Sequence, residues 1–471
     1  MVEDAEASLE PETEQIGIGR YRDQIVNGPV FRTIFWLGTP PLVNQLVVVA
    51  YNVADTYWLS KYSELAVAVP RQMWPIFMLF HAVANALTSA GLSIVSQYIG
   101  GKAYKEASSS ASRLFTLAFF FGGALSITLL TLRHSIFTVI LSTPPEIFDY
   151  VIDYSGIIAF DVFFNYMALT YTTILQSVGD TKRPAVVNVL AVLINIVLDP
   201  FFILGVGPFP RLGVVGAALT DVMGKIISIT ALSYVCRKHY SELKIRFTKE
   251  IDINWARLVV RIGLPILTLG LMNGFAFLMQ LKLINMIGVV TATAFSIGFV
   301  VLDVVDAVLW GLSGAPAIMI GQSLGAEKPG RAKEVAWKAT ILIFFLIMVG
   351  AAAAYPIRRN IADVFADDVK IIDETEFFLR TLLPTLPFFG LFAVALSTGR
   401  GSGHTLFPTT LGIFRLWGLR IGLGYFLAFT LGMSSTGIWL AFAISNIIGG
   451  VIAIFWIKYG NWAKAVIKNR P

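Results

Sequence analysis

Residues 183–206 read RPAVVNVLAVLINIVLDPFFILGV, an almost unbroken apolar run. A helix of about 20 apolar residues spans the hydrocarbon core of a bilayer, so this run is long enough to cross a membrane once. Only helices and closed barrels satisfy every backbone hydrogen bond inside lipid. A continuous apolar run, in place of alternating apolar and polar residues, favours the helix over the barrel. The stretch therefore predicts a transmembrane helix that carries one carboxylate, Asp199.

Similar runs recur along the whole chain. Its 471 residues are 56% hydrophobic, with a mean hydropathy of +0.72, which is more apolar surface than a soluble core can bury. We therefore predict an all-α integral membrane protein with twelve transmembrane helices. The expected segments are 31–58, 64–99, 108–142, 147–179, 183–206, 212–237, 255–285, 290–323, 335–357, 370–400, 408–430 and 434–460.

The basic residues lie mostly in one set of alternate connections. An even number of spans puts both termini on one side, and that side holds most of the Lys and Arg, including those of the loop 238–254. Because Lys and Arg accumulate in cytoplasmic loops, we predict a multi-pass protein of the cell (plasma) membrane with both termini cytoplasmic. The same bias explains the net charge of +6 without nucleic acid as a partner.

The first residues, MVEDAEASLEPETEQ, are acidic and lack the basic and apolar regions of a cleaved signal. We predict a cytoplasmic tail over 1–30, whose first residues, about 25 of them, are a disordered leader, and a second cytoplasmic tail over 461–471. A regulatory role for the leader stays open. The single Cys236 provides neither a disulfide framework nor a metal cluster.

Two sequence motifs occur twice at the same spacing. LGTP at 37–40 matches IGLP at 262–265, and SQYIGG at 96–101 matches GQSLGA at 321–326. Transporters are often built from duplicated bundles. We therefore predict two pseudo-symmetric six-helix lobes, an N-lobe over 31–237 and a C-lobe over 255–460, joined by the cytoplasmic loop 238–254.

Shared glycines accompany this repeat. Gly100, Gly325, Gly179 and Gly403 each follow the expected end of a helix, where a residue in the left-handed conformation often closes the last turn. We predict a structural role for these four residues and no role in binding substrate.

Acidic residues distinguish the first lobe from the second. Asn195 and Asp199 are four residues apart, so they share one helical face, and their oxygen atoms suit a small cation. A buried carboxylate is costly unless a proton, a cation or a basic partner neutralises it. The alternative is that Asp55 or Asp199 only caps a helix. We predict a cation or proton coupling site at Asp55, Asn195 and Asp199, whose repeat-related counterparts are Gln280, Leu419 and Leu423.

These residues, in this order, resemble the multidrug and toxic compound extrusion (MATE) family, and most of all its prokaryotic DinF-like branch. The resemblance covers about residues 31–460 and is carried by NVADT at 52–56, GLS at 91–93 with the following SQ and Gly100, QSVGDTK at 176–182 and NIVLDP at 195–200. It implies a V-shaped bundle, efflux by alternating access, and coupling to H⁺ or Na⁺ at Asp55, Asn195 and Asp199, which would hold the metal ion if that ion is Na⁺.

One position departs from the family pattern. The sixth helix of the family usually reads Gly-Ala-Ala-x-Ala-Thr, whereas this chain reads GAALTD at 216–221, so that an acid follows Thr220. Asp221 could be a further coupling residue, or Lys225, one turn later on the same face, could neutralise it. Both interpretations stay open.

Other polar residues lie within the expected helices. Asp161 and Asn165 form a second pair four residues apart and, with Thr220, are candidates to line the first-lobe cavity. In the second lobe, Asp303 and Asp306 share a face and form a possible second site. The alternative, which we favour, is that they pair with Lys282, Arg415 or Arg420.

Together these features predict a secondary active multidrug efflux transporter, which exchanges organic, amphipathic or cationic, substrates against H⁺ or Na⁺. Its expected partners are small organic molecules and membrane lipid, with no cofactor besides the coupling ion, and the chain is expected to be a monomer. The alternative is a lipid-linked precursor flippase or polysaccharide exporter of the same broad superfamily, which would require basic cavity residues to hold phosphate. The chain is not expected to be an enzyme, because no HExxH, Cys-pair, Walker or Gly-x-Ser-x-Gly motif occurs.

Overall fold

The computed structural model describes residues 17–467, and every regular element in that range is helical. The prediction of an all-α protein is confirmed. The first half contains α2 (Val30–Tyr62), α3 (Ala68–Gly100), α4 (Tyr104–Ser135), α5 (Pro145–Val178), α6 (Lys182–Leu204) and α7 (Val214–His239). The second half contains α8 (Ile253–Ile287), α9 (Val289–Gly325), α10 (Pro329–Ala354), α12 (Val369–Leu382) continued by α13 (Leu386–Ser402), α14 (Leu406–Ile413) continued by the π-helical turns η4 (Phe414–Gly422) and η5 (Phe426–Thr430), and α16 (Ser434–Tyr459).

Eleven candidate membrane spans occur in the described range, judged by length and composition. The twelfth long helix is α5, which lies outside that set and carries polar residues such as Asp161 and Asn165 within its span. Large apolar side chains are exposed on the outside of the bundle, for example Phe120 at 64% and Leu278 at 59%. Such a surface fits lipid better than water.

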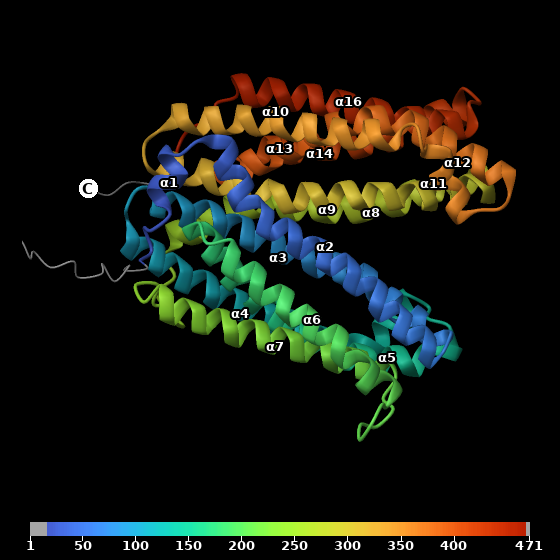
Figure 1. Ribbon diagram of the computed structural model, residues 1–471, viewed down its shortest axis with the longest axis horizontal. Helices are drawn as coiled ribbons and strands as arrows, with labels where there is room; N and C mark the ends of the chain where they lie inside the picture. The colour runs from blue at the N-terminus through green and yellow to red at the C-terminus, as the bar shows by residue number, and fades with distance from the viewer. Residues whose placement is uncertain (1–16, 468–471) are drawn as a thin grey trace, which may run out of the picture.

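The helices form two arms that meet at one end and diverge toward the other (Figure 1). Helices α2 to α7 make one arm, and α8 to α16 make the second. Helix α2 packs against α9, and α3 packs against α8 and α9, so the first two long helices of each half join the arms. The described ends of the chain lie at the joined end, as an even number of spans requires.

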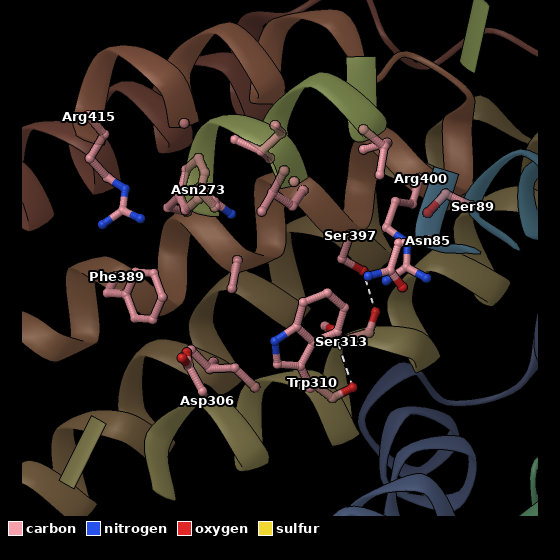
Figure 2. Close-up of a pocket in the computed structure, with 18 of the residues that line it drawn as sticks. Asn85, Ser89, Asn273, Asp306, Trp310, Ser313, Phe389, Ser397, Arg400 and Arg415 are labelled. Carbon is pink, nitrogen blue, oxygen red and sulfur yellow. Dashed lines mark hydrogen bonds between the residues drawn. The ribbon is translucent and has the colours of Figure 1, made fainter. Parts of the chain in front are cut away.

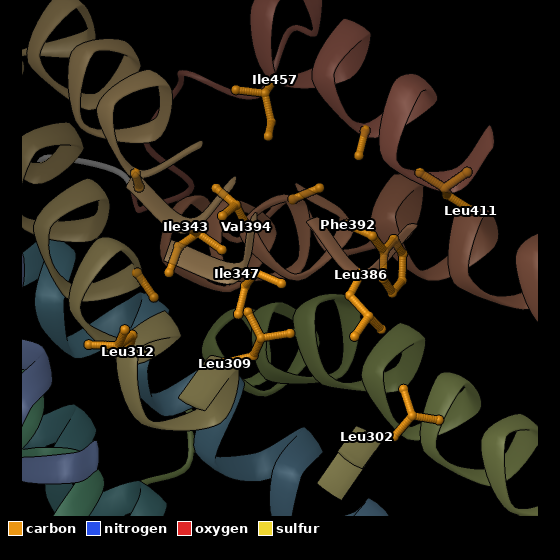
Figure 3. Packing of buried hydrophobic residues seen from close by; sticks show 14 of the residues in the cluster. Leu302, Leu309, Leu312, Ile343, Ile347, Leu386, Phe392, Val394, Leu411 and Ile457 are labelled. Atoms are coloured by element: carbon orange, nitrogen blue, oxygen red, sulfur yellow. The ribbon is translucent and has the colours of Figure 1, made fainter. Parts of the chain in front are cut away.

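The core of the second arm is apolar (Figure 3). Leu309 on α9, Ile343 and Ile347 on α10, and Leu386 on α13 are between 1% and 5% exposed and belong to one cluster. Close packing of this kind makes the second arm a stiff unit.

Two glutamines related by the repeat hold the joined end together. Gln97 on α3 donates from its Nε2 to the carbonyl oxygens of Gly401 and Ser402 on α13, both at 3.2 Å. Gln322 on α9 donates from its Nε2 to the carbonyl oxygen of Ser177 on α5 at 2.8 Å. Each arm therefore donates to the other, and the Oε1 atom of Gln97 also accepts from the backbone amide of Val466 at 2.9 Å.

The glycines of the repeat have two different roles. Gly179 and Gly403 do adopt the left-handed conformation, with φ of 99° and 79°, at the ends of α5 and α13. The same prediction is wrong for Gly100 and Gly325, which are the last helical residues of α3 and α9. They are needed for close approach, because a Cβ on either would overlap the backbone of Gln322 or Gln97 on the other arm.

The predicted tails are only partly described, because residues 1–16 and 468–471 lie outside the described range. Within that range, part of the expected leader is ordered as a short helix, α1 (Arg22–Asn27). Arg22 donates from its Nε to the carbonyl oxygen of Gly100 at 2.7 Å, and the amide of Ile18 donates to Glu242 at 2.9 Å. The prediction of a disordered leader was based on its low hydrophobicity. It is wrong for these residues, because hydrogen bonds to the joined end hold them in place.

Candidate functional site

The first arm contains a cavity of about 290 Å³ whose wall is rich in acidic and aromatic residues. Helix α2 contributes Tyr51 and Asp55, and α7 contributes Asp221 and Lys225. Helix α5 contributes Asp161 and Asn165. The other lining residues are Asn52, Pro70, Trp74, Phe77, Phe80, His81, Ala84, Tyr154, Ile158, Val162 and Tyr166.

Asp221 joins three helices of this arm. Its Oδ1 atom accepts a hydrogen bond from the hydroxyl of Tyr51 on α2 at 2.5 Å. The same atom accepts from the Nδ2 atom of Asn195 on α6 at 2.9 Å. Two neutral donors on one oxygen stabilise the carboxylate without cancelling its charge.

Asp199 lies behind the cavity wall and is fully buried. Its Oδ1 atom accepts from the hydroxyl of Thr220 on α7 at 2.7 Å, whereas its Oδ2 atom has no hydrogen-bond partner among the described residues. Helix α6 continues through Pro200 to Leu204. Since proline has no amide hydrogen, the carbonyl of Ile196 lacks its helical donor, which leaves another oxygen in the same turn.

Asp55 is the third carboxylate of this cluster, with Asp221 and Asp199. It lies on α2 well before the end of that helix at Tyr62, and its buried Oδ1 atom has no partner in the described part of the chain. It is close enough to Asp221 and Asp199 for their charges to interact. Neither Asp55 nor Asp199 caps a helix in this structure.

The structure does not pair Asp221 with Lys225, which is one of the two interpretations that the sequence left open. No ion pair within 4.0 Å joins them among residues 17–467. Asp161 and Asn165 lie on the cavity wall, but Thr220 does not, because it is fully buried against Asp199.

The sequence analysis missed Tyr51. This residue lies four positions before Asp55, so the two share a face of α2, and that spacing was a signal that could have revealed it. The bond that it forms with Asp221 joins residues 170 positions apart, which no local pattern can predict.

The second arm has a cavity of its own, of about 230 Å³, where α3 of the first arm meets α8, α9, α13 and α14 (Figure 2). Asp306, Arg400 and Arg415 are its charged lining residues. Asp303 is exposed and is not part of the wall. The expected ion pairs of Asp303 and Asp306 with Lys282, Arg415 or Arg420 are not formed, because within the described range Arg415 and Arg420 donate to Asn446 instead.

No group of three or more His, Cys, Asp or Glu side chains in the described range is arranged to hold a metal ion. The predicted set Asp55, Asn195 and Asp199 includes an amide, so this finding does not test it.

Comparisons with known proteins match this architecture. The family model described as MatE matches twice, over residues 40–201 and 265–426, one match in each half of the chain. A probable multidrug resistance protein of Bacillus subtilis, YoeA, is 25% identical over 83% of this chain and 87% of its own length. An FAD transporter of Shewanella oneidensis is 23% identical over 92% of this chain and 96% of its own. A solved structure of MATE in the bent conformation superposes with a TM-score of 0.85 at 22% identity, covering 93% of this chain and 96% of that one.

Proposed function

This chain belongs to the MATE family of membrane transporters, and from that premise we propose that it exports organic molecules in exchange for H⁺ or Na⁺. The observation that supports this proposal is the cluster of three carboxylates in the first arm. Asp55, Asp199 and Asp221 lie close together, and two of them have a buried oxygen without a hydrogen-bond partner in the described residues. An unneutralised carboxylate is costly at such a depth, so a proton or a small cation is needed there.

Proton or cation binding can be coupled to movement because the acids lie on different helices. Asp55 is on α2, Asp199 on α6 and Asp221 on α7, and α2 also packs against the second arm. Neutralising the acids lets these helices pack more closely, whereas their ionised forms repel one another. We propose that this change in α2 alters the angle between the arms and so exposes the cavities to opposite sides in turn.

The proposal extends to the placement of the protein. The joined end, which holds the basic loop 238–254 and both described ends of the chain, would face the cytoplasm, and the arms would then diverge outward in the plasma membrane. The two halves of the chain, 31–237 and 255–460, act as the moving lobes, and a single chain contains both cavities, so a monomer suffices.

The test is transport by purified protein in proteoliposomes with Na⁺ and H⁺ gradients imposed separately. Ethidium, riboflavin and flavin mononucleotide serve as fluorescent organic probes of different charge. We expect one gradient to accelerate the efflux of at least one probe and the other gradient to have no effect. Equal efflux rates with and without either gradient would contradict the proposal.

A second function is favoured by one observation. A lipid-linked precursor flippase requires basic cavity residues to hold phosphate, and Arg400 and Arg415 line the second cavity. Movement of a phospholipid analogue between leaflets, measured in the same proteoliposomes without probe, distinguishes it from export of soluble molecules.

The hydroxyl of Tyr51 provides a prediction for the coupling site. Tyr51→Phe removes one donor from the Asp221 carboxylate, and a hydrogen bond to a charged group contributes about 1.5 kcal/mol or more, which is roughly tenfold in rate or affinity. We expect the concentration of the coupling cation that gives half-maximal efflux to shift by about this factor. The matched control is Tyr57→Phe, on the same helix, whose ring is 51% exposed. Equal behaviour of the two variants would exclude Tyr51 from the coupling site.

A further inference from the structure

The second cavity contains more positive charge than its surroundings neutralise. Arg400 on α13 makes no hydrogen bond or ion pair with any described residue, and its buried Nε atom has no partner. Its guanidinium lies over the ring of Trp310, whose centre is 5.9 Å from the Arg400 Cζ atom. A buried guanidinium without a counter-ion is costly, so this group is placed to receive an anion.

Arg415 has the same deficit at the other end of the cavity. It is 5% exposed, and its Nε atom also lacks a partner in the described range. Its guanidinium donates to the Oδ1 atom of Asn446 at 3.2 Å and lies over the rings of Phe389 and Phe392, with Cζ 4.9 and 4.7 Å from their centres. These neutral partners orient the charge without cancelling it.

A third guanidinium increases the positive potential. Arg415 and Arg420 lie on the π-helical turn η4, in which hydrogen bonds link residues five apart, so both side chains point to one side. Arg420 donates to the same Asn446 oxygen at 2.9 Å. Asp306 is the one acid on the cavity wall, and no ion pair within 4.0 Å joins it to either arginine among the described residues. The cavity wall therefore has one carboxylate and two guanidinium groups, and Arg420 lies behind it on the same turn.

The rest of the wall is suited to an aromatic body with polar groups. Figure 2 shows Arg415 and Arg400 at opposite ends of the lined space, with Trp310 between them and Phe389 beside Arg415. Next to Arg400 lies Asn85 on α3, whose side chain forms no hydrogen bond with the described residues. The amide of Asn85 and the guanidinium of Arg400 together form a pair of free donors, the arrangement that recognises a phosphate or carboxylate.

We infer that this cavity binds amphipathic organic anions, in which a phosphate or carboxylate group contacts Arg400 and Asn85 and an aromatic or apolar body lies against Trp310 and Phe389. The inference uses the proposed transport function only in calling this ligand a substrate. It departs from the cationic substrates that the sequence suggested, because the wall of this cavity has two guanidinium groups and only one carboxylate. The anion also joins the arms, since Asn85 belongs to the first arm and Arg400 to the second.

Binding without any ion gradient tests this inference independently of transport. Flavin mononucleotide and riboflavin share one aromatic ring system and differ by a phosphate. Titration calorimetry on purified protein in detergent should give a Kd at least about tenfold lower for flavin mononucleotide, as expected for a charge-assisted hydrogen bond to phosphate. Dihexanoyl phosphatidylglycerol against dihexanoyl phosphatidylcholine provides the lipid arm of the experiment. A preference within the flavin pair identifies a soluble ligand, whereas a preference within the lipid pair alone identifies a headgroup.

The variants assign the effect to the named residues. Arg400→Gln should remove the preference for the anionic member of the pair, and Arg400→Lys should restore most of it, because a structural role alone would not depend on charge. Arg71→Gln, which changes an exposed arginine on α3, should have no effect. Absence of any preference in the unchanged protein, or a preference that survives Arg400→Gln, would overturn the inference. Failure of gradient-driven efflux with the binding preference intact would instead contradict the proposed function alone.

Discussion

Asp199→Asn is expected to reduce gradient-driven efflux to the rate of passive leak. Asparagine keeps the size of the side chain and can still accept the hydrogen bond of Thr220, which is 2.7 Å from the Asp199 Oδ1 atom. It cannot exchange a proton in the physiological range, and it removes the negative charge that attracts a cation. Because the residue is fully buried, no water can replace the lost carboxylate.

The measurement is efflux from proteoliposomes under the gradient that drives the unchanged protein. Folding should be unaffected, since removing a charge from a buried position costs little when its hydrogen bond is kept. Asp153→Asn is the control, because it makes the same chemical change at an exposed position on α5 of the same arm. If Asp199→Asn transports as fast as Asp153→Asn, the carboxylate of Asp199 has no part in coupling.

Gly325→Ala is expected to open the joined end of the two arms. A methyl group on Gly325 would overlap the backbone carbonyl of Gln97 across the interface. Backbone atoms cannot rotate away as a side chain does, so the arms must separate, and overpacking of this kind costs about 1–3 kcal/mol. Separation also weakens the hydrogen bonds that Gln97 makes to Gly401 and Ser402. We therefore expect a lower melting temperature in detergent and slower transport.

Gly350→Ala is the matched control, and this variant is not expected to lower the melting temperature. Gly350 lies inside α10, and a methyl group there has no heavy atom within 4 Å. Alanine in a helix interior is favoured over glycine by roughly 0.5–1 kcal/mol, so this variant should melt at the same or a higher temperature. A Gly325→Ala protein that melts no lower than the Gly350→Ala protein would show that the arms do not meet as closely as described.

The helices and the duplication follow from local patterns. Apolar runs of about 20 residues require lipid whatever the rest of the chain does. The last predicted segment, 434–460, ends one residue after α16 (Ser434–Tyr459). The family match in two halves agrees with the repeat that LGTP and IGLP indicated.

The sequence by itself determined the helical type of the elements and the acids of the first arm, because periodicity and the cost of a charge in lipid act along a single helix. Contacts between helices were decided only by the tertiary structure. Asp221 and Lys225 share a helical face, yet Asp221 contacts Tyr51 and Asn195, since the rotation of α7 against α2 and α6 selects its partners. In the same way, only packing shows that Arg415 contacts Asn446 instead of Asp306. The acids of the first arm were therefore predictable as a set, whereas the unneutralised guanidinium groups of the second arm were visible only after the helices were assembled.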